Sequence, residues 1–232
     1  MILEGPAHID GIERISSITL SPSSHHFIVL SLLHRWLAEI AVSHARGVLL
    51  DFGCGGQPYR QLFLPHISTY VGADVSQASG VTLDIRLVPG GPVPLPDRSV
   101  DTILSTQVLE HVFDFTSYLA ECHRLLRRGG MLIITVPQQW RLHEVPFDYW
   151  RFTRYGLSEV LSRGGFLVET MTPCGGVFAL IGQILASHLS EGRRPSKELL
   201  TTLNRLALWL DARAPDYQDT LLWMCVARSA TG

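Results

Sequence analysis

The chain has 232 residues, of which 46% are hydrophobic and 17% charged. These proportions are ordinary for a globular protein and exclude a disordered, collagen-like or coiled-coil chain. Nineteen basic against twenty-one acidic residues give a net charge of −2, without the basic stripe that nucleic-acid-binding proteins usually carry. We therefore expect a single domain over residues 1–232 that does not bind nucleic acid.

Cysteine usage and hydropathy predict an intracellular protein. The four cysteines lie far apart and form no C-x-x-C pair, which favours neither a zinc site nor a disulfide framework. The first residues lack the basic start and apolar core of a signal peptide. The longest apolar stretch, Val177–Ala186, has about half of the roughly 20 residues that a membrane span needs. We expect a cytoplasmic protein without a transmembrane segment.

The order of apolar patterns predicts an α/β fold. Apolar residues from Phe27 to Ile40 recur at helical spacing, which places a helix in an N-terminal segment over 1–46. Short apolar runs then alternate with helical stretches, an order typical of a parallel sheet covered by helices on both faces. Strands are expected over Gly47–Asp51, Thr69–Asp74, Val81–Asp84, Val100–Ser105, Met131–Val136, Phe166–Met171 and Thr220–Ala227. Helices are expected over Tyr59–Phe63, Val108–Arg128 and Thr153–Arg163, and Gly129 and Gly130 are expected to end the second of them.

The segment over 175–215, between the sixth and seventh strands, is too long to be a simple connection. Its apolar spacing predicts two amphipathic helices inserted before the last strand, which falls in 216–232. The apolar side of such helices must be covered by the sheet, by a second copy of the chain or by a membrane surface. We expect a second copy of the chain to cover this apolar side, in a homodimer.

A glycine-rich turn follows the first strand and reads Asp51-Phe-Gly53-Cys54-Gly55-Gly56-Gln-Pro58. Parallel sheets bind ligands at the carboxyl ends of their strands, where glycines let the backbone approach closely. The dinucleotide fingerprint needs a further glycine where this chain has Pro58, so that match fails. Asp51 would repel a pyrophosphate, but it suits a ligand that presents an ammonium group, such as S-adenosylmethionine (SAM).

In these residues the chain resembles the class I SAM-dependent methyltransferases, over about Val48–Val226. The resemblance implies a Rossmann-like sheet of seven strands with an antiparallel last strand, and a cofactor-binding core over 47–174. It implies that Asp74 binds both ribose hydroxyls, which one carboxylate can accept together, and that Asp84 and Ile85 contact the adenine. The other implied cofactor contacts are Asp51, Gly53, Cys54, Gly55, Val75, Thr106 and Gln107.

The stretch after the fifth strand, Gln138–Thr153, places aromatic, amide and charged groups where the methyl acceptor is expected. It resembles a segment of methyltransferases from sugar, polysaccharide and natural-product biosynthesis, which implies a small polar acceptor. Four residues are candidates for binding that acceptor: Trp140, Asp148, Tyr149 and Arg151. Arg151 alternatively pairs with Glu144 or Asp148 and only anchors the loop.

A hydroxyl acceptor must lose a proton, and imidazole has the right unperturbed pKa to receive it. His143, held by Glu144, and His111 are the candidates for this general base; alternatively, the loop only shapes the pocket. We thus predict methyl transfer from SAM to an oxygen or nitrogen of a small molecule, with S-adenosylhomocysteine (SAH) as product. A SAM-binding scaffold without catalysis and an RNA methyltransferase are the alternatives. No cluster of acids indicates a metal, and none is expected.

Overall fold

The computed structural model describes residues 20–78, 80–191 and 195–230, which build one seven-stranded sheet. The strand order is β3-β2-β1-β4-β5-β7-β6. The strands are β1 (Val48–Phe52), β2 (Thr69–Asp74), β3 (Ile85–Arg86), β4 (Val100–Thr106), β5 (Leu126–Pro137), β6 (Phe166–Pro173) and β7 (Leu222–Ser229). β7 runs antiparallel to both of its neighbours, whereas the β1–β2, β1–β4, β2–β3 and β4–β5 pairs are parallel. The predicted fold class is confirmed.

Helices cover both faces of the sheet, because successive strand residues point to opposite sides. Leu49 packs in one core with α1 (Phe27–His44) and α2 (Arg60–Phe63). Leu50 packs in the other with α3 (Phe115–Leu125) and α4 (Arg154–Arg163). Two 3-10 turns complete this part of the chain, η1 (Leu64–His66) after α2 and η2 (Leu109–His111) after β4. Loops surround the carboxyl ends of the central strands.

The predicted helix over Val108–Arg128 is confirmed over Phe115–Leu125 and is wrong at both ends. η2 ends at His111, and α3 starts afresh where the Asp114 carboxylate accepts the Ser117 N–H at 3.1 Å. α3 stops at Leu125 and β5 begins directly, so Gly129 lies in a strand instead of closing a helix. Its φ of +69° coincides with a register shift between β4 and β5, which explains why a glycine stands there.

The third strand also lies later than predicted. The predicted residues, Val81–Asp84, form no strand; β3 is Ile85–Arg86. The chain meets β2 at Asp84, whose carboxylate accepts the Gly72 N–H at 2.8 Å. Parallel pairing begins one residue later, with Ile85 opposite Ala73.

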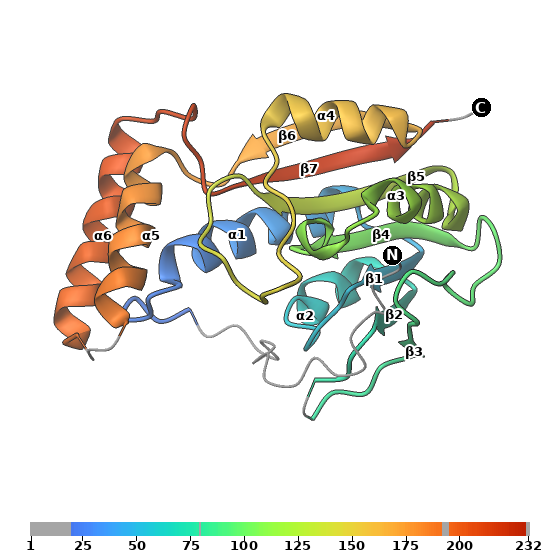
Figure 1. The fold of residues 1–232 in the computed structure, drawn as a ribbon, viewed down its shortest axis with the longest axis horizontal. Coiled ribbons are helices and arrows are strands. Elements are labelled where there is room, and N and C mark those ends of the chain that lie inside the picture. The colour runs from blue at the N-terminus through green and yellow to red at the C-terminus, as the bar shows by residue number, and fades with distance from the viewer. Residues whose placement is uncertain (1–19, 79, 192–194, 231–232) are drawn as a thin grey trace.

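The segment between β6 and β7 forms the two expected helices, α5 (Val177–Ser190) and α6 (Lys197–Arg213). They stand side by side at one end of the molecule, beyond the sheet (Figure 1). The Gln183 amide donates to the His25 carbonyl at 2.6 Å, and the Asn204 amide donates to the Ser24 carbonyl at 2.8 Å. The pair therefore rests on α1 and the segment before it. Several of its apolar side chains stay exposed, namely Ile181, Ile184, Leu185, Leu189, Leu199, Leu206 and Trp209, and the homodimer remains a prediction.

Among the described helices, α1 alone is long and apolar enough to cross a membrane, with a mean hydropathy of 1.2. The expectation of no transmembrane segment rested on the longest uninterrupted apolar stretch, which does not lie in this helix. Its inner side, including Leu33, Leu37 and Ile40, is buried in the core beside β1. That packing is typical of the core helix of a globular domain, which passes the same test of length and composition. Of the predicted N-terminal segment over 1–46, residues 1–19 lie outside the described part of the chain.

Candidate cofactor and acceptor site

The turn after β1 is held by backbone hydrogen bonds and fits only glycine. The Gly53 and Cys54 N–H groups donate to the Ala73 carbonyl at 2.8 and 3.1 Å, which ties the turn to the end of β2. Gly53 has a φ of +86°, and a Cβ there would lie 2.5 Å from a Val108 methyl. Gly55 has a φ of +51°. The turn thus packs between β2 and the segment that leads into η2.

Asp51 is buried at the end of β1, with 1% of its surface exposed. The Tyr70 hydroxyl donates to Oδ2 of its carboxylate. Among the described residues, Oδ1 has no hydrogen-bond partner. Burial raises the pKa of Asp51 to about 7, because the Tyr70 bond offsets it only in part and the neighbouring Asp74 charge raises it further. A cationic ligand at Oδ1 would satisfy this carboxylate.

Asp74 at the end of β2 is oriented by backbone N–H groups. Its carboxylate accepts from Gly55 at 2.8 Å and from Ser76 at 3.0 Å, and only 2% of the residue is exposed. Val75 follows directly in the chain. The predicted ribose acid therefore forms part of the same turn as the glycines.

The remaining predicted cofactor residues lie at the same edge of the sheet. Asp84 and Ile85 lie where the chain enters β3, and Thr106 ends β4. Gln107 has a φ of +54°, and both its backbone N–H and its amide donate to Thr135, at 3.0 and 2.9 Å. The structure thus brings all these positions to the carboxyl ends of β1, β2 and β4, as expected for one ligand.

The loop between β5 and α4 folds back over η2 (Figure 1). The Tyr149 and Trp150 N–H groups both donate to the Glu110 carbonyl, at 2.9 and 3.2 Å. The Phe152 N–H donates to the Pro137 carbonyl at 2.9 Å and closes the loop at its base. Groups about 40 residues apart in the sequence therefore meet at η2.

Arg151 fixes the shape of this loop. Its guanidinium forms a bidentate ion pair with Asp148 at 2.5 and 2.7 Å and donates to the carbonyls of Trp140, Arg141 and Trp150. Each nitrogen of the guanidinium has a protein acceptor. Burial by itself would raise the pKa of Asp148, but the bonds from Arg151 and from the His143 N–H lower it to about 2. Of the two pairings left open, Arg151 forms the one with Asp148, and its role in binding an acceptor stays a prediction.

The two imidazoles lie together, with ring centroids 4.7 Å apart. Nδ1 of His143 is 3.2 Å from the Asp148 carboxylate, and Glu144 instead lies beside His111, with 3.9 Å between Oε2 and Nε2. Nδ1 of His111 lies 3.0 Å from the Phe147 carbonyl. Burial lowers the pKa of His111. The expected pairing of His143 with Glu144 is therefore wrong: Asp148 supplies the carboxylate at His143.

Glu110 belongs to this cluster but was not among the candidates that the sequence suggested. The residue has no exposed surface, and neither oxygen of its carboxylate has a hydrogen-bond partner in the part of the chain that the structure describes. Burial raises its pKa to about 8. Oε1 lies 3.9 Å from His111 Nε2. An acid directly after the buried Leu109 was the available signal, since such residues are rarely buried without a partner.

Comparisons with known proteins agree with this geometry. The profile of the family described as "Methyltransferase domain" matches residues 50–134. A probable SAM-dependent methyltransferase of Mycolicibacterium smegmatis is 30% identical over 134 residues, covering 52% of each chain. Residues 50–134 are thus similar to the methyltransferase domain, in agreement with the resemblance that the motifs indicate. The chain spans about half the length of that curated relative.

Solved structures share the fold of this chain at low sequence identity. The cyclase SpnF has a TM-score of 0.57 and 21% identity, over 86% of this chain and 80% of its own. An N1-methyltransferase of Burkholderia thailandensis, solved with 1,6-didemethyltoxoflavin and SAH, has a TM-score of 0.55 and 18% identity, over 85% and 78%. At these identities the likeness concerns the fold alone.

A hollow of about 470 Å³ lies between the start of the β5–α4 loop and α5. Amide, aromatic and charged groups line it, namely Gln138, Gln139, Trp140, Arg141, Arg151, Gln183, Ile184, Ser187, His188, Glu191 and Leu221. Of the predicted acceptor residues, Trp140 and Arg151 face this hollow. Tyr149 is 39% exposed and packs against Phe113 with ring centroids 5.4 Å apart.

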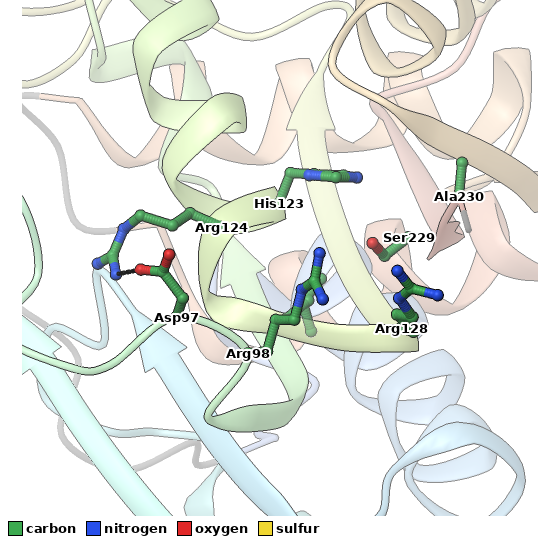
Figure 2. Close-up of a pocket in the computed structure, with 8 residues that line it drawn as sticks. Asp97, Arg98, His123, Arg124, Arg128, Ser229 and Ala230 are labelled. Carbon is green, nitrogen blue, oxygen red and sulfur yellow. Dashed lines mark hydrogen bonds and ion pairs between the residues drawn. The ribbon is translucent and has the colours of Figure 1, made fainter. Parts of the chain in front are cut away.

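A second hollow, of about 270 Å³, lies at the opposite edge, where β4 and β5 begin. Figure 2 shows Arg98, Arg128 and His123 around it, with Arg124 held by Asp97. Because ligands of parallel sheets bind at the carboxyl ends of the strands, this hollow is separate from the candidate site.

Proposed function

We propose that this methyltransferase transfers the methyl group of SAM to an oxygen or nitrogen of a small polar molecule, such as a sugar or a natural-product intermediate. The observation that carries the proposal is the turn Asp51–Gly56 joined to Asp74. Its buried Asp51 oxygen, without a partner among the described residues, suits the ammonium of SAM. Asp74 is held by Gly55 at the end of β2, in a position that suits the ribose hydroxyls.

In the proposed reaction, an acceptor atom attacks the methyl carbon in line with its bond to sulfur. The S–C bond breaks as the O–C or N–C bond forms, and SAH leaves. Most of the acceleration comes from positioning the two reactants. His111, His143 and Glu144 are proposed to promote the removal of the proton that a hydroxyl acceptor loses, since His143 and Glu144 both lie beside His111.

The hollow beside Trp140 supports a small acceptor. Its volume, about 470 Å³, falls within the roughly 300–1,000 Å³ typical of small-molecule sites. Glutamine amides and an aromatic ring suit a molecule rich in hydroxyl groups, which stacks on the ring and exchanges hydrogen bonds with the amides.

The alternative with support is a SAM-binding protein that does not transfer methyl groups. It is favoured by the fold shared with SpnF, which is named a cyclase. Two measurements on the purified chain separate the proposals: calorimetry with SAH, and transfer of tritiated methyl from SAM to a panel of sugars, phenols, amines and bulk tRNA. We expect SAH binding, and labelling of a hydroxyl or amine compound.

Each other result has a defined meaning. Absence of SAH binding would overturn the proposed function. SAH binding without labelling of any acceptor class would favour the non-catalytic alternative, and labelling of tRNA alone would favour an RNA substrate. Asp74→Ala, which removes the proposed ribose contacts, is the negative control for both assays.

A further inference from the structure

We propose that Glu110, His111 and His143 form a binding site for one divalent transition-metal ion. One ligand atom from each residue lies within 4.8 Å of the others. The residues come from two segments, η2 after β4 and the loop after β5. This site departs from the expectation that no metal is bound, because His143 meets Glu110 and His111 only in the fold. Only the role of the ion in catalysis rests on the proposed function.

The Glu110 carboxylate is the observation that points to a ligand. It is fully buried, and both oxygens lack a hydrogen-bond partner among the described residues. Buried polar groups are nearly always satisfied, since an unpaired one costs free energy. The carboxylate reaches into the cluster, with Oε1 3.9 Å from His111 Nε2. A cation between these groups supplies the missing partner.

Both imidazoles are held in the way that is typical of metal ligands, in which one ring nitrogen binds the metal and the other is bonded to a carbonyl or carboxylate. Nδ1 of His111 is 3.0 Å from the Phe147 carbonyl. Nδ1 of His143 is 3.2 Å from the Asp148 carboxylate, and Arg151 fixes that carboxylate in turn. In each ring Nε2 is the nitrogen left for an ion.

The set of donors selects the class of ion. Two imidazoles and one carboxylate suit Zn²⁺, Fe²⁺ or Mn²⁺, whereas Ca²⁺ and Mg²⁺ prefer oxygen ligands throughout. Bonds of about 2.0–2.2 Å require the cluster to contract around the ion. The side chains of His111 and His143 are 16% and 29% exposed. The ion therefore has a route from solvent and an open position for a further ligand.

With the acceptor at that open position, the ion would serve as a Lewis acid. A hydroxyl acceptor bound to it has a lowered pKa. The proton passes to Glu144, whose Oε2 is 3.9 Å from His111 Nε2. The alkoxide oxygen then bonds to the methyl carbon, the S–C bond breaks with its electron pair staying on sulfur, and SAH leaves.

The test uses the untagged chain, stripped of metal with a chelator and dialysed. Calorimetric titration with Zn²⁺ and absorption spectra with Co²⁺ are expected to show one ion per chain, with visible Co²⁺ bands of a low-coordinate nitrogen and oxygen site. Glu110→Gln and His143→Ala are each expected to weaken Zn²⁺ binding by at least about tenfold, the lower bound for losing even an outer-shell partner. His66→Ala, an exposed histidine on η1, is the matched control and should bind as the wild type does.

SAH calorimetry on the same samples separates this proposal from the proposed function. Wild-type chain that binds SAH but no Zn²⁺ overturns the metal site and leaves the methyltransferase proposal standing. Zn²⁺ binding that both variants retain also overturns it, since the ion then lies elsewhere. Should Glu110→Gln fail to fold by circular dichroism, the partly exposed His143→Ala and the wild-type Co²⁺ spectrum decide the matter.

Discussion

The turn after β1 and the loop after β5 both stand at the carboxyl edge of the sheet, yet they are built in opposite ways. In the turn, backbone N–H groups fix the functional carboxylate, as the Gly55–Asp74 bond of 2.8 Å illustrates. In the loop, side chains from two distant segments converge, and Glu110 is buried without a hydrogen-bond partner among the described residues. The proposed cofactor end is therefore shaped by the backbone, and the proposed acceptor end by side chains, one of which is a buried carboxylate without a hydrogen-bond partner among the described residues.

Asp74→Ala is expected to have the largest effect, because it removes the carboxylate that the backbone of the turn after β1 holds in place. The loss is about 1.5–3 kcal/mol for each of two charge-assisted bonds to the ribose. Gly55 also loses the acceptor of its N–H. SAH calorimetry measures the loss of affinity. Asp97→Ala removes an exposed acid at the opposite edge and is the control; equal affinity of Asp74→Ala and wild type would contradict the assignment.

Arg151→Met tests whether side-chain contacts stabilise the loop between β5 and α4. The Asp148 side chain has no exposed surface and that of Arg151 is 27% exposed, so the substitution leaves a buried charge without its partner. We expect the free energy of unfolding to fall by about 3 kcal/mol, measured by urea denaturation. Arg163→Met breaks an exposed pair with Glu159 and should cost less than about 0.5 kcal/mol. Similar losses in both variants would show that the Arg151 pair does not hold the loop.

The difference between the two ends also explains what could be predicted from the sequence. The residues of the turn follow strands whose apolar runs are plain, and parallel strands bring their carboxyl ends together whatever the loops do. Asp51, Gly53 and Asp74 could therefore be placed at one edge from the sequence alone. The wrong boundaries arose where local patterns compete: Gly129 was interpreted as a helix end, but it serves a register shift between two strands.

The acceptor end could be predicted only in part. His143, Asp148 and Arg151 were singled out from one loop, but their pairing depends on how that loop folds. The correct partner of His143 is Asp148, five residues away, and the adjacent Glu144 turns to His111 in the other segment. Glu110 was not chosen as a candidate because its significance lies in its burial, for which the preceding apolar Leu109 was the one local signal.

Gly53→Ala tests the contact between the turn after β1 and Val108, which precedes η2. The new Cβ would lie 2.5 Å from a Val108 methyl, and alanine would have to adopt a φ of +86°. We expect SAH affinity to fall by about 1–3 kcal/mol through this strain. The double variant Gly53→Ala/Val108→Ala relieves the clash but not the backbone strain, and should recover part of the loss. Full recovery would show that packing alone requires the glycine; no recovery would leave the positive φ as the sole cause.

The smallest expected effect is on pH dependence, and it tests whether Asp51 meets the ammonium of the cofactor. Burial raises the pKa of Asp51 to about 7, with the Asp74 charge adding to the rise and the Tyr70 hydroxyl opposing it. Below that pH the free protein holds Asp51 protonated, and binding an ammonium must expel the proton. Affinity for SAH is therefore expected to rise by about fivefold from pH 6 to pH 7 as the ionised fraction grows. Calorimetry in two buffers of different ionisation enthalpy should detect the released proton, and Asp51→Asn, which cannot ionise, should remove both the slope and the release. A slope that persists in Asp51→Asn would assign the titration to another group and leave the buried Oδ1 of Asp51 without its proposed ligand.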